Sequence, residues 1–287
     1  MTATTTVRTT TPEGDSGRPS VDTRPAGALV SLRTFGSVLW RDVFVTGREL
    51  VPFLAQVVIQ PFFMLFIFGK VLSNLGYVNG AQFAPVLMAG IVALNGFLGG
   101  LQNTTMPLIM DFSFTREIED RLLAPMPIPL VAVEKMVFGA LRGIVAAVLM
   151  VPVGLLILDN VSWPLAKLPA VFGVIVLGAL AGAAIGLTIG TLVTPRRINI
   201  MFALILTPLM FTGCTQFPWR GLAHLRWFQV VCAFNPLTYI SEGMRAILIH
   251  DPKMPSLPLW LDVSAAVLAI LVFGGIGIWG FMRRAID

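Results

Sequence analysis

Long apolar runs are the feature of this sequence that most restricts how the chain can fold. A helix that crosses the hydrocarbon core of a bilayer needs about 20 mostly apolar residues. Six stretches approach or exceed that length, with the fifth of them the shortest. They are residues 51–72, 83–110, 133–158, 169–193, 198–214 and 260–282. The runs predict an all-α membrane protein with six transmembrane helices.

Composition excludes a water-soluble alternative. Hydrophobic residues make up 56% of the 287, charged residues make up 12%, and the mean hydropathy is +0.83. A soluble domain carries about 25% charged residues, which it needs to cover its surface. This chain therefore needs lipid as part of its solvent.

The distribution of Lys and Arg predicts the topology. Residues 1–27 are polar, with no apolar run, so they predict a disordered tail that stays in the cytoplasm. With that end inside, the cytoplasmic segments carry thirteen Lys and Arg and the outer segments carry six. Cytoplasmic loops are enriched in these residues, so both termini are expected inside. The same placement accounts for the net charge of +5 without nucleic acid as a partner.

Residues 28–50 predict an amphipathic helix before the first span. At 100° per residue one face is apolar, and basic residues lie on the other. Such a helix lies flat at the cytoplasmic interface, with its basic side toward lipid headgroups or a protein partner. The alternative is a simple topology anchor. The apolar face holds Ala28, Leu32, Phe35, Leu39 and Val43; the basic face holds Arg33, Arg41 and Arg48.

A concentrated group of charges lies between the second and third apolar runs, in FTREIEDRLLAPMPIP, residues 114–129. Thr115 is a candidate N-cap, acidic residues come early and Pro125 ends the pattern, which predicts a short helix under the membrane. Such an element suits a groove on a cytoplasmic partner, with charge fixing the register. The alternative is a solvated loop with ordinary flanking charges. The charged residues are Arg116, Glu117, Glu119, Asp120 and Arg121.

Uncharged polar residues gather in the second run, at Asn95, Gln102, Asn103, Thr104 and Thr105. They have two interpretations: hydrogen bonds between helices, or the lining of a pathway for a solute of mixed character. Charge is nearly absent from the runs. Arg142 is expected to extend toward the cytoplasmic edge, and without a buried acid ion-coupled transport is disfavoured.

The fourth run contains four glycines at a spacing of four, at Gly178, Gly182, Gly186 and Gly190. That spacing forms a groove for close helix packing. The partner helix belongs either to the same subunit or to a dimer seam, and the pattern leaves both open.

Residues 215–260 are too polar to cross the bilayer and too apolar for an ordinary outer loop. Pro236 divides them into two pieces, which predicts a re-entrant helical hairpin dipping into the outer leaflet. Glu242 and Arg245 are three residues apart, close enough to pair. Nearby Cys214 and Cys232 lie in apolar stretches and are expected to be free thiols.

Motifs for catalysis and metal binding are missing from the sequence. It contains no GxxxxGK[ST] loop, CxxC pair or HExxH pattern. We therefore expect no catalytic residue, metal site or cofactor in this chain.

Two segments carry a resemblance to a known family. The charged turn followed by Leu122-Leu123-Ala124-Pro125, and the segment NPLTYISEGMRAI at 235–247, resemble ABC-2 type transporter permeases, with the daunorubicin-resistance branch as the nearest likeness. The resemblance covers about residues 28–284. It implies the membrane domain 51–287 of a bacterial inner-membrane exporter, built from two permease subunits and two P-loop ATPase subunits that hold ATP and Mg.

The resemblance also assigns roles to residues of this chain. It implies that Arg116, Glu117, Glu119, Asp120 and Arg121 couple to the ATPase, with Arg33, Arg41 and Arg48 as a second contact. Asp120-Arg121 stand where the family commonly has Gly-Thr, a departure at the ATPase contact. We expect a route between the first, second and fifth runs, lined by Asn95, Gln102, Asn103 and Thr104. It would end at the hairpin residues Asn235, Pro236, Tyr239, Glu242 and Arg245.

The expected cargo is an amphipathic drug or antibiotic. A related alternative is a lipid-linked glycan or glycolipid. A third possibility, from a different class, is a membrane assembly protein whose charged helix binds a partner other than an ATPase.

Overall fold

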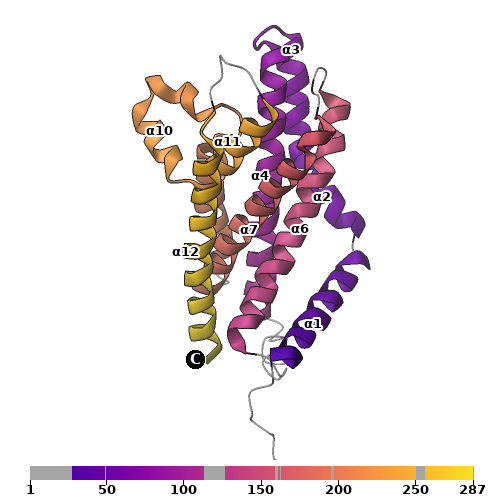
Figure 1. Ribbon diagram of the computed structural model, residues 1–287, viewed down its shortest axis with the longest axis vertical. Coiled ribbons are helices and arrows are strands. Elements are labelled where there is room, and N and C mark those ends of the chain that lie inside the picture. Colours follow the sequence, from indigo (N-terminus) through magenta and orange to yellow (C-terminus); the bar gives the residue numbers. More distant parts are fainter. Residues whose placement is uncertain are drawn as a thin grey trace, which may run out of the picture.

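The helices follow the apolar runs closely. A computed structural model describes residues 28–48, 50–112, 127–158, 161, 163–194, 197–249 and 256–286, and in these ranges the chain forms helices and no strand. The long helices stand side by side in an elongated bundle (Figure 1). Toward one end lie α3 (Leu72–Asn74) and α11 (Pro236–Leu248), and at the other lie α1 (Ala28–Arg48) and the C-terminus.

Most of the expected spans are continuous helices. Five helices of the described part are long and apolar enough to cross a membrane: Val57–Asn74, Gly80–Met110, Ile128–Ile157, Leu165–Leu192 and Leu259–Arg284. The first combines part of α2 (Leu50–Met64), the π-helical η1 (Leu65–Val71) and α3 (Leu72–Asn74). The others are, in chain order, α4 (Gly80–Met110), α6 (Ile128–Ile157), η3 (Leu165–Lys167) with α7 (Leu168–Leu192), and α12 (Leu259–Ile286).

The fifth expected span, residues 198–214, is built differently. It consists of α8 (Ile198–Met201), the π-helical η5 (Phe202–Leu206) and α9 (Thr207–Thr212), called here the broken helix. Its fifteen residues extend only about 22 Å at 1.5 Å per residue, against a hydrocarbon core of about 30 Å. A sixth crossing therefore stays a prediction.

After the broken helix come η6 (Trp219–His224), α10 (Arg226–Ala233) and α11 (Pro236–Leu248). The prediction of two short helices on either side of Pro236 agrees with α10 and α11, although their depth in a membrane is untested. Cys214 and Cys232 are both buried and free.

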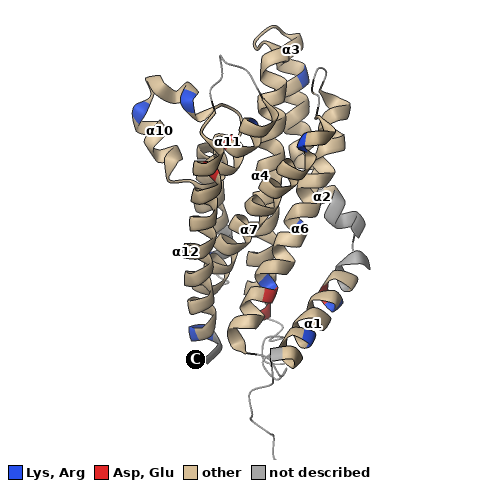
Figure 2. Cartoon of the chain, in the orientation of Figure 1, with Lys and Arg blue, Asp and Glu red and all other residues tan. Residues whose placement is uncertain are grey.

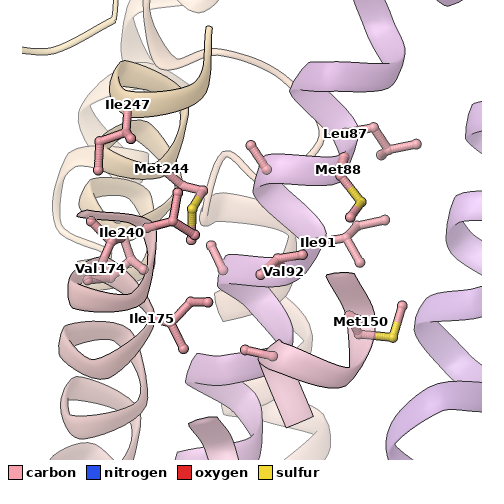
Figure 3. Close-up of a cluster of buried hydrophobic side chains, with 14 of the residues drawn as sticks. Leu87, Met88, Ile91, Val92, Met150, Val174, Ile175, Ile240, Met244 and Ile247 are labelled. Carbon is pink, nitrogen blue, oxygen red and sulfur yellow. The ribbon is translucent and has the colours of Figure 1, made fainter. Parts of the chain in front are cut away.

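The core is centred on α4, which packs against α6, α7 and α11. Figure 3 shows its upper part, where Met88 and Ile91 of α4 lie with Ile175 of α7 and with Ile240 and Met244 of α11. The second hairpin helix is therefore anchored in the bundle core.

Glycines allow α4 and α7 to approach closely. A Cβ atom added to Gly182 would lie 1.9 Å from the Phe97 carbonyl oxygen, and one added to Gly186 would lie 2.5 Å from that of Leu101. The glycine groove of the fourth run thus packs against α4 of the same subunit, as the packing interpretation predicts.

The outer surface of the bundle is apolar. Leu156 of α6, Phe172 of α7 and Leu271 of α12 are exposed, whereas the charged side chains gather toward the two ends (Figure 2). An exposed apolar belt between charged ends is the surface that a bilayer requires.

Candidate functional site

A cavity of about 570 Å³ opens between α2, α4, α6 and the broken helix, and it is called here the α4 cavity. Two of the helical segments that border it, the first span with η1 and the broken helix with η5, contain π-helical turns. Its lining residues are Val57, Gln60, Pro61, Met64, Ile91, Leu94, Asn95, Leu98, Gly99, Gln102, Asn103, Met106, Pro107, Met110, Arg142, Phe202 and Met210.

One face of α4 supplies three of the polar residues of this lining. Asn95, Gln102 and Asn103 recur at helical spacing and all face the cavity. The Asn95 side-chain amide donates to the Ala146 carbonyl oxygen at 2.9 Å, and the Asn103 amide donates to that of Gly99 at 2.7 Å. These bonds fix the two side chains at the cavity wall.

Thr104 belongs to a different face. It is buried, its hydroxyl donates to the Gly100 carbonyl oxygen at 2.8 Å, and it contacts Gly139 of α6. Thr105 likewise donates to the Gly186 carbonyl oxygen of α7 at 3.1 Å. Both threonines therefore take part in helix packing, which was the first of the two interpretations of the polar residues in this run. Asn95, Gln102 and Asn103 line a cavity, which was the second.

Two further polar residues in the lining were not assigned to it by sequence reasoning. Gln60 enters from α2, and Arg142 enters from α6 with its guanidinium carbon 5.8 Å from the centre of the Phe138 ring. Arg142, which was expected to extend toward the cytoplasmic edge, lines the cavity; the expected direction stays a prediction. An isolated arginine within an apolar run was the available signal.

The hairpin residues form a second polar group. The Asn235 side chain accepts from the Leu237 backbone N–H at 2.9 Å, capping α11 ahead of Pro236. Its amide donates to the Leu209 carbonyl oxygen at 2.7 Å, and the Tyr239 hydroxyl donates to that of Ala233 at 2.8 Å. Asn235 thereby ties the start of α11 to the broken helix.

The expected pairing of Glu242 with Arg245 is confirmed, with 2.8 Å between Oε1 and Nη1 and both side chains buried. Arg245 also donates to the carbonyl oxygens of Cys214 and Thr215, and Glu242 accepts from the Trp219 backbone N–H at 2.9 Å. Burial lowers the pKa of Arg245, which Glu242 opposes. We call these five residues the hairpin clasp.

The expectation that no acid is buried within the runs is wrong for Glu134 of the third run and for Asp262 of the sixth, which are 0% and 2% exposed. Asp262 lies in the first turn of α12, and neither of its carboxylate oxygens has a hydrogen-bond partner in the described part of the chain. It lies against α11, where a Cβ added to Gly243 would be 3.7 Å from Oδ2.

A third polar group lies at the other end of the bundle. Lys135 of α6 places its Nζ 2.6 Å from Asp111 Oδ2, at the end of α4, and 3.9 Å from Asp42 Oδ2 on α1 (Ala28–Arg48). This Lys135 cluster connects three helices. Arg33 and Arg41 of α1 are exposed, and the side chain of Arg48 lies outside the described part.

The five residues expected to couple to an ATPase, Arg116, Glu117, Glu119, Asp120 and Arg121, also lie outside the described residues. Their role stays a prediction. The structure does place the two ends of that segment: α4 leads into it at Asp111, and α6 follows it from Ile128.

Comparison with known proteins decides the family. Residues 33–249 match the model of the ABC-2 type transporter family. The chain belongs to this family. The matched range of this ABC-2 protein contains the α4 cavity, the hairpin clasp and most of α1, and it ends before α12.

Curated relatives agree with the assignment. The ABC-2 protein is 26% identical over 260 residues to the inner membrane transport permease YadH of Escherichia coli K12, covering 86% of this chain and 94% of the relative. It is 26% identical over 231 residues to the putative transport permease ycf38 of Porphyra purpurea, covering 75% and 76%. No solved structure matches significantly. Membership of the family makes the chain a multi-pass membrane transport permease. Permeases of this family in general work with an ATPase partner.

Proposed function

We propose that this chain is the membrane-spanning subunit of an exporter driven by ATP. A separate P-loop ATPase, in two copies per complex, hydrolyses the ATP, and a second copy of this permease or a similar one completes the pathway. The proposal places the chain in a bacterial inner membrane with both termini in the cytoplasm. The name of the relative YadH and the excess of Lys and Arg in the assigned cytoplasmic segments support that placement.

The α4 cavity is the observation that carries the proposal. It lies between α2, α4 and the broken helix, and it combines side-chain amides with methionine and leucine. Methionine side chains adapt to ligands of different shape, and fixed amides orient a polar group. A cavity of this character suits an amphipathic solute, such as a drug, an antibiotic or a lipid-like molecule.

Coupling is proposed to run through the segment that contains Glu117 and Arg121. This segment is continuous with α4 on one side and α6 on the other, and both helices line the cavity. The Lys135 cluster ties α1 to the same two helices. Movement imposed on the segment or on α1 by an ATPase would therefore reach the walls of the cavity.

The hairpin is the proposed outer gate. Asn235 is bonded to the broken helix, which lines the cavity, and the hairpin clasp holds η6 and α11 together. A solute that leaves the cavity on this side would pass Asn235, Pro236 and Tyr239.

Purification in mild detergent tests the partner. The chain is isolated from native membranes and the proteins that accompany it are identified, for the parent, the Glu117→Lys/Arg121→Glu double variant and a control, Arg226→Glu on α10. A P-loop ATPase should accompany the parent and the control, and the double variant should lose it although it reaches the membrane. Absence of any ATPase from the crosslinked parent complex would contradict the exporter and favour an assembly protein.

A further inference from the structure

We propose that the outward side of α10 binds anionic phospholipid, with its apolar side chains in the bilayer and with Arg220 and Arg226 on the phosphate headgroups. The inference goes beyond the proposed function, because it concerns the surface on which the hairpin lies and holds with or without an ATPase. The surface, called here the α10 face, consists of Arg220, Arg226, Trp227, Val230, Val231 and Phe234.

The apolar part of the α10 face is the first argument. Its four large apolar side chains are exposed, Phe234 most of all at 85%. At 100° per residue they fall within about 100° of arc, so they form one continuous stripe along the helix. A contiguous exposed apolar patch marks a surface that meets a membrane or another protein. A helix with such a stripe and with basic residues beside it is typical of the membrane interface.

The opposite side of α10 is packed and bonded. Cys232 is buried, and the Phe228 ring centre lies 6.2 Å from that of Phe217. The Trp219 indole N–H donates to the Gln229 carbonyl oxygen at 3.0 Å, and the Gln229 side-chain amide donates to the Trp219 carbonyl oxygen at 3.2 Å. These contacts hold α10 to η6 and fix the α10 face on the outside.

The level of α10 along the bundle suits a headgroup region. The next helix, α11, packs against the first turn of α12, where a Cβ atom added to Gly243 would lie 3.7 Å from Leu259 Cδ1. The Tyr239 hydroxyl of α11 donates to the Ala233 carbonyl oxygen of α10 at 2.8 Å. In Figure 1, α10 projects to one side near the end of the bundle at which α12 begins. A bilayer that α12 crosses therefore has one headgroup layer near α10.

The charge around the face is the argument for anionic lipid. Arg220 and Arg226 are exposed, and residues 215–241 contain no Asp or Glu. Figure 2 accordingly shows blue and no red in the segment around α10. Basic residues near a membrane surface attract anionic headgroups. The planar guanidinium can also bind a phosphate through two N–H donors at once.

A second copy of the chain fits this face less well than lipid does. A symmetric contact brings the same surface of both copies together. Arg220 and Arg226 would then meet their own counterparts, with no acidic residue in 215–241 to offset them. Like charges placed together oppose association. An anionic phospholipid instead supplies both the opposite charge and an apolar body.

Fluorescence quenching by labelled lipid tests the inference. Val230→Cys in the full-length chain is labelled with monobromobimane, and the parent chain, whose cysteines are buried, gives the background. Nanodiscs of phosphatidylcholine receive a trace of phosphatidylglycerol or of phosphatidylcholine with a nitroxide on the acyl chain next to the headgroup. The charge variant is Arg220→Gln/Arg226→Gln. The matched control is Arg283→Gln, at an exposed arginine near the far end of α12.

Both lipids should quench the reporter, and phosphatidylglycerol should do so with about fivefold higher affinity than phosphatidylcholine. The double variant should bring this ratio to about one without changing quenching by phosphatidylcholine, and Arg283→Gln should keep the ratio. Raised salt should lower the ratio, because it screens the arginines. Equal affinity for the two lipids in the chain with both arginines, or a ratio that survives the double variant, overturns the inference.

A second reporter covers the case in which Val230→Cys fails to fold. Phe234→Cys, at the other end of the same stripe, should give the same ratio. Absence of quenching by either lipid overturns the inference, and a disulfide between two copies at the reporter cysteine would then assign the face to a second copy. The exporter proposal fails separately, through absence of the ATPase.

Discussion

At the scale of single residues, Glu242 and Arg245 organise the end of the bundle that contains α11. Two buried charges are costly unless they are paired and their remaining hydrogen-bonding groups are satisfied. Here the pair also holds two backbone carbonyl oxygens and one backbone N–H. Gly90 of α4 lies against Thr215, where an added Cβ would be 1.7 Å from the carbonyl oxygen. The clasp therefore fixes the hairpin to α4.

Removal of one charge tests the clasp. Arg245→Met keeps much of the side-chain volume but leaves Glu242 buried without its partner, so we expect a loss of about 3–5 kcal/mol of stability. Thermal unfolding in detergent measures it, with the exposed Arg226→Met as the control. A variant as stable as the control would show that the pair does not hold the hairpin.

The spacing of residues along α4 predicted part of the cavity lining. Asn95, Gln102 and Asn103 share a helical face, and that pattern was readable in the sequence. Thr104 is adjacent in the chain, but one residue rotates the side chain by about 100°, so it meets α6 instead. Gln60 and Arg142 join the cavity only because α2 and α6 pack beside α4, and a single-helix pattern does not contain that information.

At the scale of elements, length and packing decide which runs become continuous spans. Hydropathy placed five helices within a few residues of their ends, because bilayer thickness sets a minimum length. It did not show that the fifth run is interrupted by a π-helical segment at η5, nor that another, η1, follows α2 in the first run. Such turns are often found at functional sites, and both of these helices border the α4 cavity.

A pair of glycine variants on α7 tests the packing of the core helices. Gly182→Ala places a Cβ 1.9 Å from the Phe97 carbonyl oxygen, so the helices must separate and stability should fall by about 1–3 kcal/mol. Gly173→Ala has no atom within 4 Å of the new Cβ, and the higher helix propensity of alanine should leave it equal or up to about 1 kcal/mol more stable.

Unfolding midpoints in the same detergent compare the two variants. Equal destabilisation, or none at Gly182, would contradict the close contact of α7 with α4.

At the scale of the whole molecule, α4 connects the three polar groups. Its 31 residues extend about 46 Å. It touches the hairpin clasp through Gly90, lines the cavity through Asn95 to Asn103, and ends at Asp111 in the Lys135 cluster. The outward faces of α6, α7 and α12 are apolar. An apolar exterior thus surrounds three polar groups that lie along one helix.

The most direct test of the account is ATP-driven transport through the α4 cavity. The chain and its ATPase are reconstituted in proteoliposomes, and movement of a fluorescent amphipath, 11-(dansylamino)undecanoic acid, and of its primary amide is followed with and without ATP. Met106→Trp should lower the ATP-dependent rate for any transported probe by about tenfold or more, and Leu271→Trp on the outer face of α12 should match the parent. ATP-dependent transport by Met106→Trp at the parent rate would contradict the cavity as the path.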